Sequence, residues 1–298
     1  MTQRSPVGHY APAMDLPGYS FETMTPAEVL TITQWAADEQ WNPGLHDVEI
    51  AHALDPDAFI SLRRGDEMVG GGSSFSYHGD FGFIGLFIMR PDLRGQGIGS
   101  VLWNHLVTVM RSRLSPGASI GIDGVFNVVP FYEKTGFSFA YRNLRFDGVA
   151  SPAPDQGLVP FVPSAFDELV AYDQPFHAVD RSEFLRAWVG HPAFHTATVV
   201  EHGHLVGYGC LRPCRSGFRF GPVVADRPDI AERLLVGLMA TVAGQPVQLD
   251  VPEPNAAALA LAGRFSMAES FGTARMYNGS TPQIAVDRTY GVTSFEFG

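Results

Sequence analysis

The chain has 298 residues, 45% of them hydrophobic, which is enough for one large or two ordinary soluble domains. Its formal net charge of -11 argues against nucleic acid as a partner, because phosphate-binding surfaces need clustered basic residues. Short apolar runs and the lack of a signal pattern predict a cytoplasmic protein that binds no membrane. Two cysteines and no histidine pair at ligand spacing predict no metal.

The first half of the sequence divides clearly by its apolar pattern. Residues 1–18 are rich in proline and aperiodic, so we expect an N-terminal arm. In residues 19–24 apolar and polar residues alternate, as in a strand. Thr25 and Pro26 predict the start of a helix that runs to about Ala37, because threonine caps helix N-termini and proline suits the first helical turn. The elements expected next are a helix from near Asp47, a hairpin at 59–63 and 68–77, a strand at 81–89 and a helix at 100–110.

A glycine-rich loop, Arg94-Gly95-Gln96-Gly97-Ile98-Gly99-Ser100, joins that last strand and helix. Alternate glycines let successive N–H groups point the same way, and the following helix adds the positive end of its dipole. The loop is therefore suited to a diphosphate. No lysine follows Gly99, which argues against a Walker-type triphosphatase, and the glycine spacing differs from the G-x-G-x-x-G pattern of dinucleotide-binding folds.

Two segments resemble the motifs of one enzyme family. Met89-Arg90-Pro91-Asp92-Leu93-Arg94-Gly95-Gln96-Gly97-Ile98-Gly99 resembles motif A of the GCN5-related N-acetyltransferases (GNAT), and Phe131-Tyr132-Glu133-Lys134-Thr135-Gly136-Phe137 resembles motif B. The resemblance covers residues 20–147 and implies an α/β (α+β) fold, a mixed, mostly antiparallel sheet flanked by helices in the order β-α-α-β-β-β-α-β-α-β. It implies that acetyl-CoA donates an acetyl group to a small-molecule amine by direct attack in a ternary complex.

The resemblance also implies which residues bind coenzyme A. In the family, the strand before the loop pairs with pantetheine and the loop holds the pyrophosphate. The asparagine commonly found seven positions before the motif B tyrosine is replaced here by Val125, so either Asn127 takes over its contact or the coenzyme is held without it. The residues assigned to the coenzyme are Phe87, Ile88, Met89, Arg94, Gly95, Gln96, Gly97, Ile98, Gly99, Ser100, Asn127, Phe131, Tyr132 and Lys134.

Tyr132 and Asp123 are assigned to catalysis. Tyr132 stands where the family often has a tyrosine that serves as general acid for the departing thiolate; the alternative is an aromatic ring that packs helix against sheet. The base stays open among Asp123, Glu39 and His46, because the family uses different carboxylates or water relays. Asp123 is placed beside the thioester at the end of the fifth strand, and a turn role beside Gly124 is equally consistent.

Trp41, Asn42 and Asp123 are assigned to the acceptor. Trp41 and Asn42 lie between the first two helices, a segment that forms a wall of the acceptor pocket in this family, although Asn42-Pro43-Gly44 also suits a plain turn. The other hypotheses are a noncatalytic protein that binds coenzyme A as a sensor, and transfer of a longer acyl group or transfer to a protein N-terminus or lysine. We expect a monomer or homodimer.

The second half looks like a repeat of the first. Residues 148–159 are rich in proline and glycine and predict a linker between domains at 19–147 and 160–298. In the second half, 196–211 echoes the hairpin, 218–242 the strand-turn-helix and 247–277 the strand-helix-strand.

The repeat differs at the segment aligned with the glycine-rich loop. Pro228 lacks an N–H there, and Asp226 and Asp229 would repel a diphosphate, so we expect this half to have lost coenzyme binding. The arrangement is similar to tandem acetyltransferases with a degenerate C-terminal half, the YitH/HolE-like group.

Overall fold

The structure is a computed structural model that describes residues 16–298. The predicted arm at residues 1–18 falls almost entirely outside the described residues. The first half has the predicted order of elements, joined in places by short 3₁₀ turns. These elements are β1 (Tyr19–Thr23), α1 (Pro26–Asp38), α2 (Asp47–Leu54), β2 (Phe59–Arg64), β3 (Glu67–Tyr77), β4 (Phe81–Met89), α3 (Ile98–Arg113), β5 (Ser119–Val125), α4 (Val129–Lys134) and β6 (Ser138–Val149).

The start of α1 is set by local chemistry that the sequence makes visible. The Thr25 hydroxyl accepts a hydrogen bond from the Glu28 N–H at 3.3 Å, and the Glu28 carboxylate accepts one from the Thr25 N–H at 2.9 Å. This reciprocal capping box satisfies two N–H groups that the helix itself cannot pair. Val29, Ile32 and Ala36 then form the buried face of the helix, at the spacing of an amphipathic helix.

The second half repeats the hairpin, strand-helix and strand-helix-strand order. Its elements are β7 (Val159–Pro160), α5 (Phe166–Asp173), α6 (Ser182–Val189), β8 (His195–Glu201), β9 (His204–Pro213), β10 (Phe218–Ala225), α7 (Pro228–Ala240), β11 (Pro246–Pro252), α8 (Ala256–Arg264), β12 (Ala268–Asn278) and β13 (Thr289–Gly291).

Among residues 16–298, no helix is both long and apolar enough to cross a membrane.

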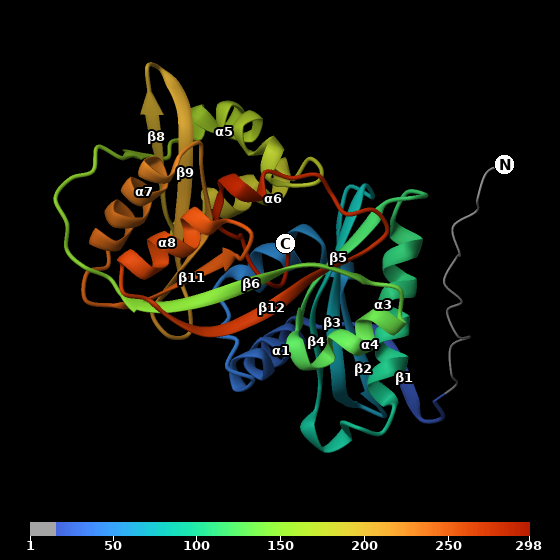
Figure 1. Cartoon of the computed structure of the whole chain (residues 1–298). Coiled ribbons are helices and arrows are strands. Elements are labelled where there is room, and N and C mark those ends of the chain that lie inside the picture. The colour runs from blue at the N-terminus through green and yellow to red at the C-terminus, as the bar shows by residue number, and fades with distance from the viewer. Residues whose placement is uncertain (1–15) are drawn as a thin grey trace.

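The two halves share one continuous sheet, in the order β1-β2-β3-β4-β5-β12-β6-β11-β10-β9-β8-β7, with β13 beside β10. The predicted mixed, mostly antiparallel sheet is confirmed, since only β4–β5 and β10–β11 are parallel among the described pairs. The halves exchange strands: β12 pairs with β5 of the first half, and β6 pairs with β11 of the second. In Figure 1, β6 and β12 run as two long ribbons between the halves.

This exchange was not predicted. β6 extends to Val149 and takes in the first two residues of the predicted linker. The predicted boundaries at 147 and 160 therefore separate the two halves of the sequence but do not separate two sheets. Each half of the sheet contains one long strand from the other half of the sequence.

β4 and β5 separate after a short parallel contact. They pair only over Phe81–Phe83 and Ser119–Gly121, and the β3–β4 register shifts between Gly71 and Ser73. Near this bulge Leu86 has a φ of +51°, an uncommon conformation for a branched side chain. The separation of the two strands leaves an opening in the sheet beyond Phe83.

The last residues of the chain pack into the first half. Residues 293–298 are buried, and the Tyr77 hydroxyl donates a hydrogen bond to the Phe297 carbonyl at 2.7 Å. The Phe297 ring packs edge-on against Phe75, at a centroid distance of 5.8 Å. The C-terminal segment (residues 293–298) is therefore part of the core beneath β4.

Candidate active site

A cavity of about 490 Å³ occupies the opening between β4 and β5. Its wall comes from the glycine-rich loop, the two strands, α4 and the second half of the chain. Most of the predicted site residues meet there. Those that line the cavity are Trp41, Phe87, Ile88, Met89, Arg94, Gly95, Gly97, Gly99, Ser100, Asp123, Asn127, Phe131 and Tyr132.

Four predicted residues do not line the cavity. The Gln96 side chain donates to the Asp92 carbonyl at 2.9 Å, and Ile98, the first residue of α3, is buried in the core. Lys134 is exposed in the last turn of α4. The Asn42 amide donates to the Ser216 carbonyl at 3.0 Å and to Gln248 at 2.9 Å. Asn42 therefore holds the two halves together and faces away from the cavity that Trp41 lines.

The glycine-rich loop has the backbone that a phosphate cradle requires. Gly95 and Gly97 have φ values of +74° and +81°, and an added β-carbon would meet nothing within 4 Å at either position. Gly97 is the N-cap of α3, a helix of 16 residues, so the positive end of its dipole points at this loop. The N–H groups of Gly95, Gln96 and Gly97 donate to no acceptor among the described residues. The loop can therefore bind an anion through its main chain.

Arg94 anchors the start of the glycine-rich loop through two side-chain contacts. Its Nε donates to the Met89 carbonyl at 2.9 Å, and its guanidinium forms an ion pair with Glu39. Both Arg94 and Glu39 line the cavity. Because the Glu39 carboxylate is paired with an arginine, it is a weak candidate for the base.

Tyr132 is part of the cavity wall. Its ring packs against Trp103 at a centroid distance of 4.7 Å and lies over Gly124, where a β-carbon would come within 2.5 Å of the ring. Burial raises the pKa of the Tyr132 hydroxyl, and no described protein group forms a hydrogen bond with that hydroxyl. The side chain is therefore a neutral donor whose proton is not committed to the protein.

Asp123 is held in a buried ion pair. Its carboxylate accepts hydrogen bonds from Arg275 at 2.6 and 3.1 Å and from the Asn143 amide at 2.8 Å, with Thr273 at 3.3 Å. Arg275 and Thr273 belong to the exchanged strand β12. The Asp123 carboxylate is therefore committed to donors from β6 and β12.

His46 lies away from the cavity, in a cluster that the sequence did not predict. Its Nδ1 is 2.9 Å from Glu49, and its ring contacts His191 at a centroid distance of 4.4 Å. The ligand atoms of these three residues lie within 4.8 Å of one another, a spacing that could hold a metal ion. The fold thus brings together a histidine pair that is far apart in sequence, and His46 is not placed to act as base in the cavity.

Sequence reasoning missed the part of the wall that the second half supplies. Phe271 and Thr273 come from β12, and Phe295 and Glu296 from the C-terminal segment. Nothing local marks these residues as part of a site, because their position depends on the strand exchange. The one available signal was an acidic residue between two phenylalanines at the end of the chain.

The second half has no comparable loop between β10 and α7. The Asp226 carboxylate accepts a hydrogen bond from the Tyr172 hydroxyl at 2.8 Å and forms an ion pair with Arg288. Arg227 is the N-cap of α7 and pairs with Asp229, and Pro228 is the first helical residue. The helix N-terminus therefore lies beside the protein's own carboxylates, and the loss of coenzyme binding by this half stays a prediction.

Both halves match acetyltransferases. Residues 27–137 match the acetyltransferase (GNAT) family, and residues 169–291 match a further acetyltransferase (GNAT) domain; together these matches cover more than two thirds of the chain. The chain belongs to the GNAT superfamily. It is a tandem member, and its family makes it an acyltransferase that uses acyl-coenzyme A.

This GNAT protein is similar to two curated acyltransferases and to two solved structures. It is 26% identical to holothin acyltransferase of Pseudoalteromonas sp. (strain SANK 73390), over 90% of both chains. It is 27% identical to the N-acetyltransferase YitH of Bacillus subtilis (strain 168), over 58% of this chain and 61% of the relative. In fold it resembles a crystal structure from Pyrococcus horikoshii (TM-score 0.80, 23% identity, 97% of this chain and 99% of that one). A tandem GNAT protein from the clavulanic acid biosynthesis pathway has a TM-score of 0.63 at 14% identity, over 89% and 99% of the two chains.

Proposed function

We propose that this GNAT protein transfers an acetyl group from acetyl-CoA to the amine of a small molecule, by direct attack in a ternary complex. The observation that carries the proposal is one cavity that is lined by the glycine-rich loop, by Tyr132 and by residues of the second half. A donor and an acceptor bound in such a cavity would meet at Tyr132. The proposal includes a cytoplasmic monomer or homodimer without a nucleic acid or membrane partner.

The first half is proposed to bind the donor mainly through its backbone. The unpaired N–H groups of Gly95 and Gly97 and the N-terminus of α3 suit the pyrophosphate. Beyond the bulge at Leu86, β4 no longer pairs with β5, so the strand edge at Phe87 to Met89 is free for the pantetheine amides. Asn127 and Phe131 line the same cavity and complete the proposed donor site.

Tyr132 is proposed as the general acid. The amine nitrogen attacks the thioester carbon and loses a proton to a base as the C–N bond forms, and the Tyr132 hydroxyl gives its proton to the thiolate that departs as the C–S bond breaks. The raised pKa of Tyr132 keeps the hydroxyl protonated at neutral pH, as this role requires. Asp123 is proposed to position β12 through Arg275, because its carboxylate is already paired.

Transfer of a longer acyl group is the second candidate. It is favoured by the similarity over 90% of both chains to a protein named as an acyltransferase, and by a cavity of about 490 Å³ with an apolar wall. Competition between acetyl-CoA and longer acyl-CoAs for turnover separates the two candidates. A noncatalytic coenzyme A sensor would bind the coenzyme and release no thiol with any acyl donor or amine.

The test is a pair of measurements on the full chain. Thermal unfolding with acetyl-CoA at about 100 times its Kd is expected to show a stabilisation of about 2.7 kcal/mol. Incubation with a panel of primary amines is expected to release free thiol at a rate that depends on the amine. Binding without thiol release from any amine would support the sensor, and absence of binding would overturn the proposal.

A further inference from the structure

Glu296 is a buried carboxylate without a partner, at the wall of the cavity. It is 5% exposed, and its Oε2 accepts no hydrogen bond from any described group. The Ser294 hydroxyl accepts hydrogen bonds from the N–H groups of Glu296 at 3.2 Å and Phe297 at 3.0 Å, which fixes the turn that carries the side chain. Burying a carboxylate without a hydrogen bond costs free energy. Because Glu296 also lines the cavity, we look for a functional role of this side chain.

Glu296 differs from the other cavity carboxylates among the described residues. Three carboxylates line the cavity: Glu39 pairs with Arg94, Asp123 pairs with Arg275, and Glu296 has no ion pair. Among these three carboxylates, only Glu296 can accept a proton or bind a ligand without first breaking an ion pair with an arginine.

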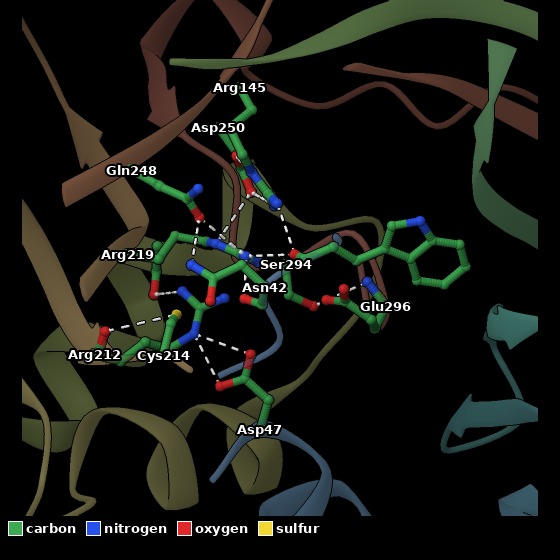
Figure 2. A network of polar contacts seen from close by, with 12 residues as sticks. Asn42, Asp47, Arg145, Arg212, Cys214, Arg219, Gln248, Asp250, Ser294 and Glu296 are labelled. Carbon is green, nitrogen blue, oxygen red and sulfur yellow. Dashed lines mark hydrogen bonds and ion pairs between the residues drawn. The ribbon is translucent and has the colours of Figure 1, made fainter. Parts of the chain in front are cut away.

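Charged groups from four elements face Glu296, and none of them forms an ion pair with it, although Nη2 of Arg212 and Nε and Nη1 of Arg219 have no hydrogen-bond partner among the described residues. Arg145 on β6 pairs with Asp250 at 2.6 and 2.7 Å, and Arg212 on β9 pairs with Asp47 on α2 at 2.9 and 3.1 Å. Figure 2 shows Ser294 and Glu296 beside this network. The fourth element, β10, supplies the cation that acts most strongly on Glu296 by charge, Arg219, whose guanidinium donates to the Trp41 carbonyl at 2.8 Å.

These surroundings make Glu296 a stronger base than an ordinary glutamate. Burial raises the pKa of its carboxyl, Asp47 raises it further, and the three arginines lower it without cancelling the effect of burial. A carboxylate whose pKa lies nearer to neutrality is better matched to proton transfer from an amine.

We propose that Glu296 is the general base of the acyl transfer and that its carboxylate marks the acceptor subsite; this inference rests on the proposed function. The Glu296 carboxylate takes the proton that the amine nitrogen loses as the C–N bond forms. Tyr132 gives a proton to the thiolate as the C–S bond breaks. One proton is taken up and one is given, and exchange with solvent restores both groups.

The walls around Glu296 indicate the class of acceptor. Trp41, Phe271 and Phe295 line the same cavity. The Arg145 guanidinium lies over the rings of Phe271 and Phe295, at 5.5 and 4.9 Å from their centroids, and fixes them in place. The subsite is therefore suited to a primary amine carried on a flat, apolar frame.

The test compares Glu296→Gln with the wild type and with Glu269→Gln, an exposed glutamate on β12. The probes are acetyl-CoA with 2-phenylethylamine and with 4-methylaniline, an amine that is already uncharged at neutral pH. Thiol release is followed from about pH 5 to about pH 9, a range that spans the ionisation of a glutamate with a raised pKa. We expect Glu296→Gln to lose about 10²- to 10⁴-fold in kcat, as expected for loss of a general base, while Glu269→Gln stays at the wild-type rate.

Three further readouts separate catalysis from folding. Wild-type kcat/KM with 4-methylaniline should rise with pH along a limb that Glu296→Gln lacks, and the Kd for acetyl-CoA should be unchanged. Because Glu296→Gln removes a buried charge without breaking a hydrogen bond, its unfolding temperature at neutral pH should equal or exceed that of the wild type. Glu296→Asp, which keeps a carboxylate, should recover part of the rate and the acid limb.

Three outcomes would count against the inference. Activity of Glu296→Gln within about threefold of wild type with both amines would overturn it and leave the proposed function standing. Equal losses in Glu296→Gln and Glu296→Asp with an unchanged pH profile would also overturn it. Wild-type protein that releases no thiol with any amine would overturn the proposed function and this inference together.

Discussion

The main-chain carbonyl of Glu296 occupies the place that a β-carbon on Gly85 would take. Gly85 lies on β4 beside the bulge at Leu86, so the absence of a side chain there lets the C-terminal segment pack directly on the strand. This contact joins the last residues of the chain to the strand that separates from β5.

Gly85→Ala is expected to destabilise the protein by about 1–3 kcal/mol, the usual effect of overpacking, and to lower activity by moving Glu296. Gly263→Ala, on α8 with nothing near its β-carbon, is the matched control and should stabilise by about 0.5–1 kcal/mol. Chemical denaturation and thiol release measure the two effects. A Gly85→Ala protein with wild-type stability would show that the C-terminal segment is not packed as described.

Gly97→Ala is expected to weaken coenzyme binding. An alanine at a φ of +81° is strained by about 1–2 kcal/mol, and relief of that strain would reorient the loop N–H groups, for an affinity loss of about 5- to 30-fold. Gly65→Ala places the same residue at a φ of +59° in the β2–β3 turn, also with open space around it. Calorimetric titration with coenzyme A should show an effect for Gly97→Ala alone, and equal effects would mean that the loop does not contact the coenzyme.

Tyr132→Phe is expected to lower kcat by about 10²- to 10⁴-fold with little change in stability, because no described group depends on the hydroxyl. Tyr172→Phe is the contrasting variant. It removes hydrogen bonds to the Val206 carbonyl and to Asp226, both at 2.8 Å, and should reduce stability without reducing kcat per folded molecule. A Tyr132→Phe enzyme with wild-type kcat would leave the ring with a packing role only.

Asp123→Asn is expected to cost about 3–5 kcal/mol of stability, because it leaves Arg275 buried without its counter-ion. Glu253→Gln, which breaks an ion pair between partly exposed side chains with Arg142, should cost no more than about 1 kcal/mol. Urea unfolding curves measure both. A small cost for Asp123→Asn would argue that the Asp123 carboxylate is free for chemistry.

The pH dependence of stability should carry the signature of His177. Burial, with Arg181 nearby, lowers the pKa of its imidazole from 6.5 to about 3. Below about pH 6.5 the His177 imidazole binds a proton in the unfolded chain, but in the folded chain it does so only near pH 3. The free energy of unfolding therefore decreases as the pH falls from about 6.5 to about 3.

His177→Phe keeps an aromatic ring beside Tyr77 and Phe81 but cannot titrate. Its unfolding temperature should therefore fall less steeply than that of the wild type between pH 6.5 and pH 4. His202→Gln, in the exposed β8–β9 turn, should keep the wild-type slope. Parallel slopes for His177→Phe and the wild type would contradict the assigned cause.

Local signals in the sequence were enough to predict the start of α1, the glycine-rich loop and the place of Tyr132 after β5. The capping box at Thr25 and Glu28 set the start of α1, and the glycines at 95 and 97 adopt the left-handed conformations that the phosphate cradle needs. Tyr132 lines the predicted cavity because motif B is a short helix directly after β5. Each of these features depends on residues close together in the chain.

The part of the cavity proposed for the acceptor depends on contacts between distant residues. The sequence makes Asp123 a candidate base beside the thioester or a turn residue, and strand exchange pairs it with Arg275, 152 positions away. Asn42 was expected in the pocket, and it instead pairs with Gln248 across 206 positions. Hydrophobic periodicity identifies strands and says nothing of which half a strand will join, so Glu296 could not be placed from sequence.

The crossed pairing of β6 and β12 also bears on how such a gene can evolve. Splitting the reading frame at the connecting segment would leave each product with an unpaired edge where its partner's strand had been, and exposed edges promote aggregation. Gene fission should therefore be tolerated only if both fragments are made together and assemble. After a duplication in which the two copies exchange these strands, both copies would be retained together, even if one copy lost its ligand.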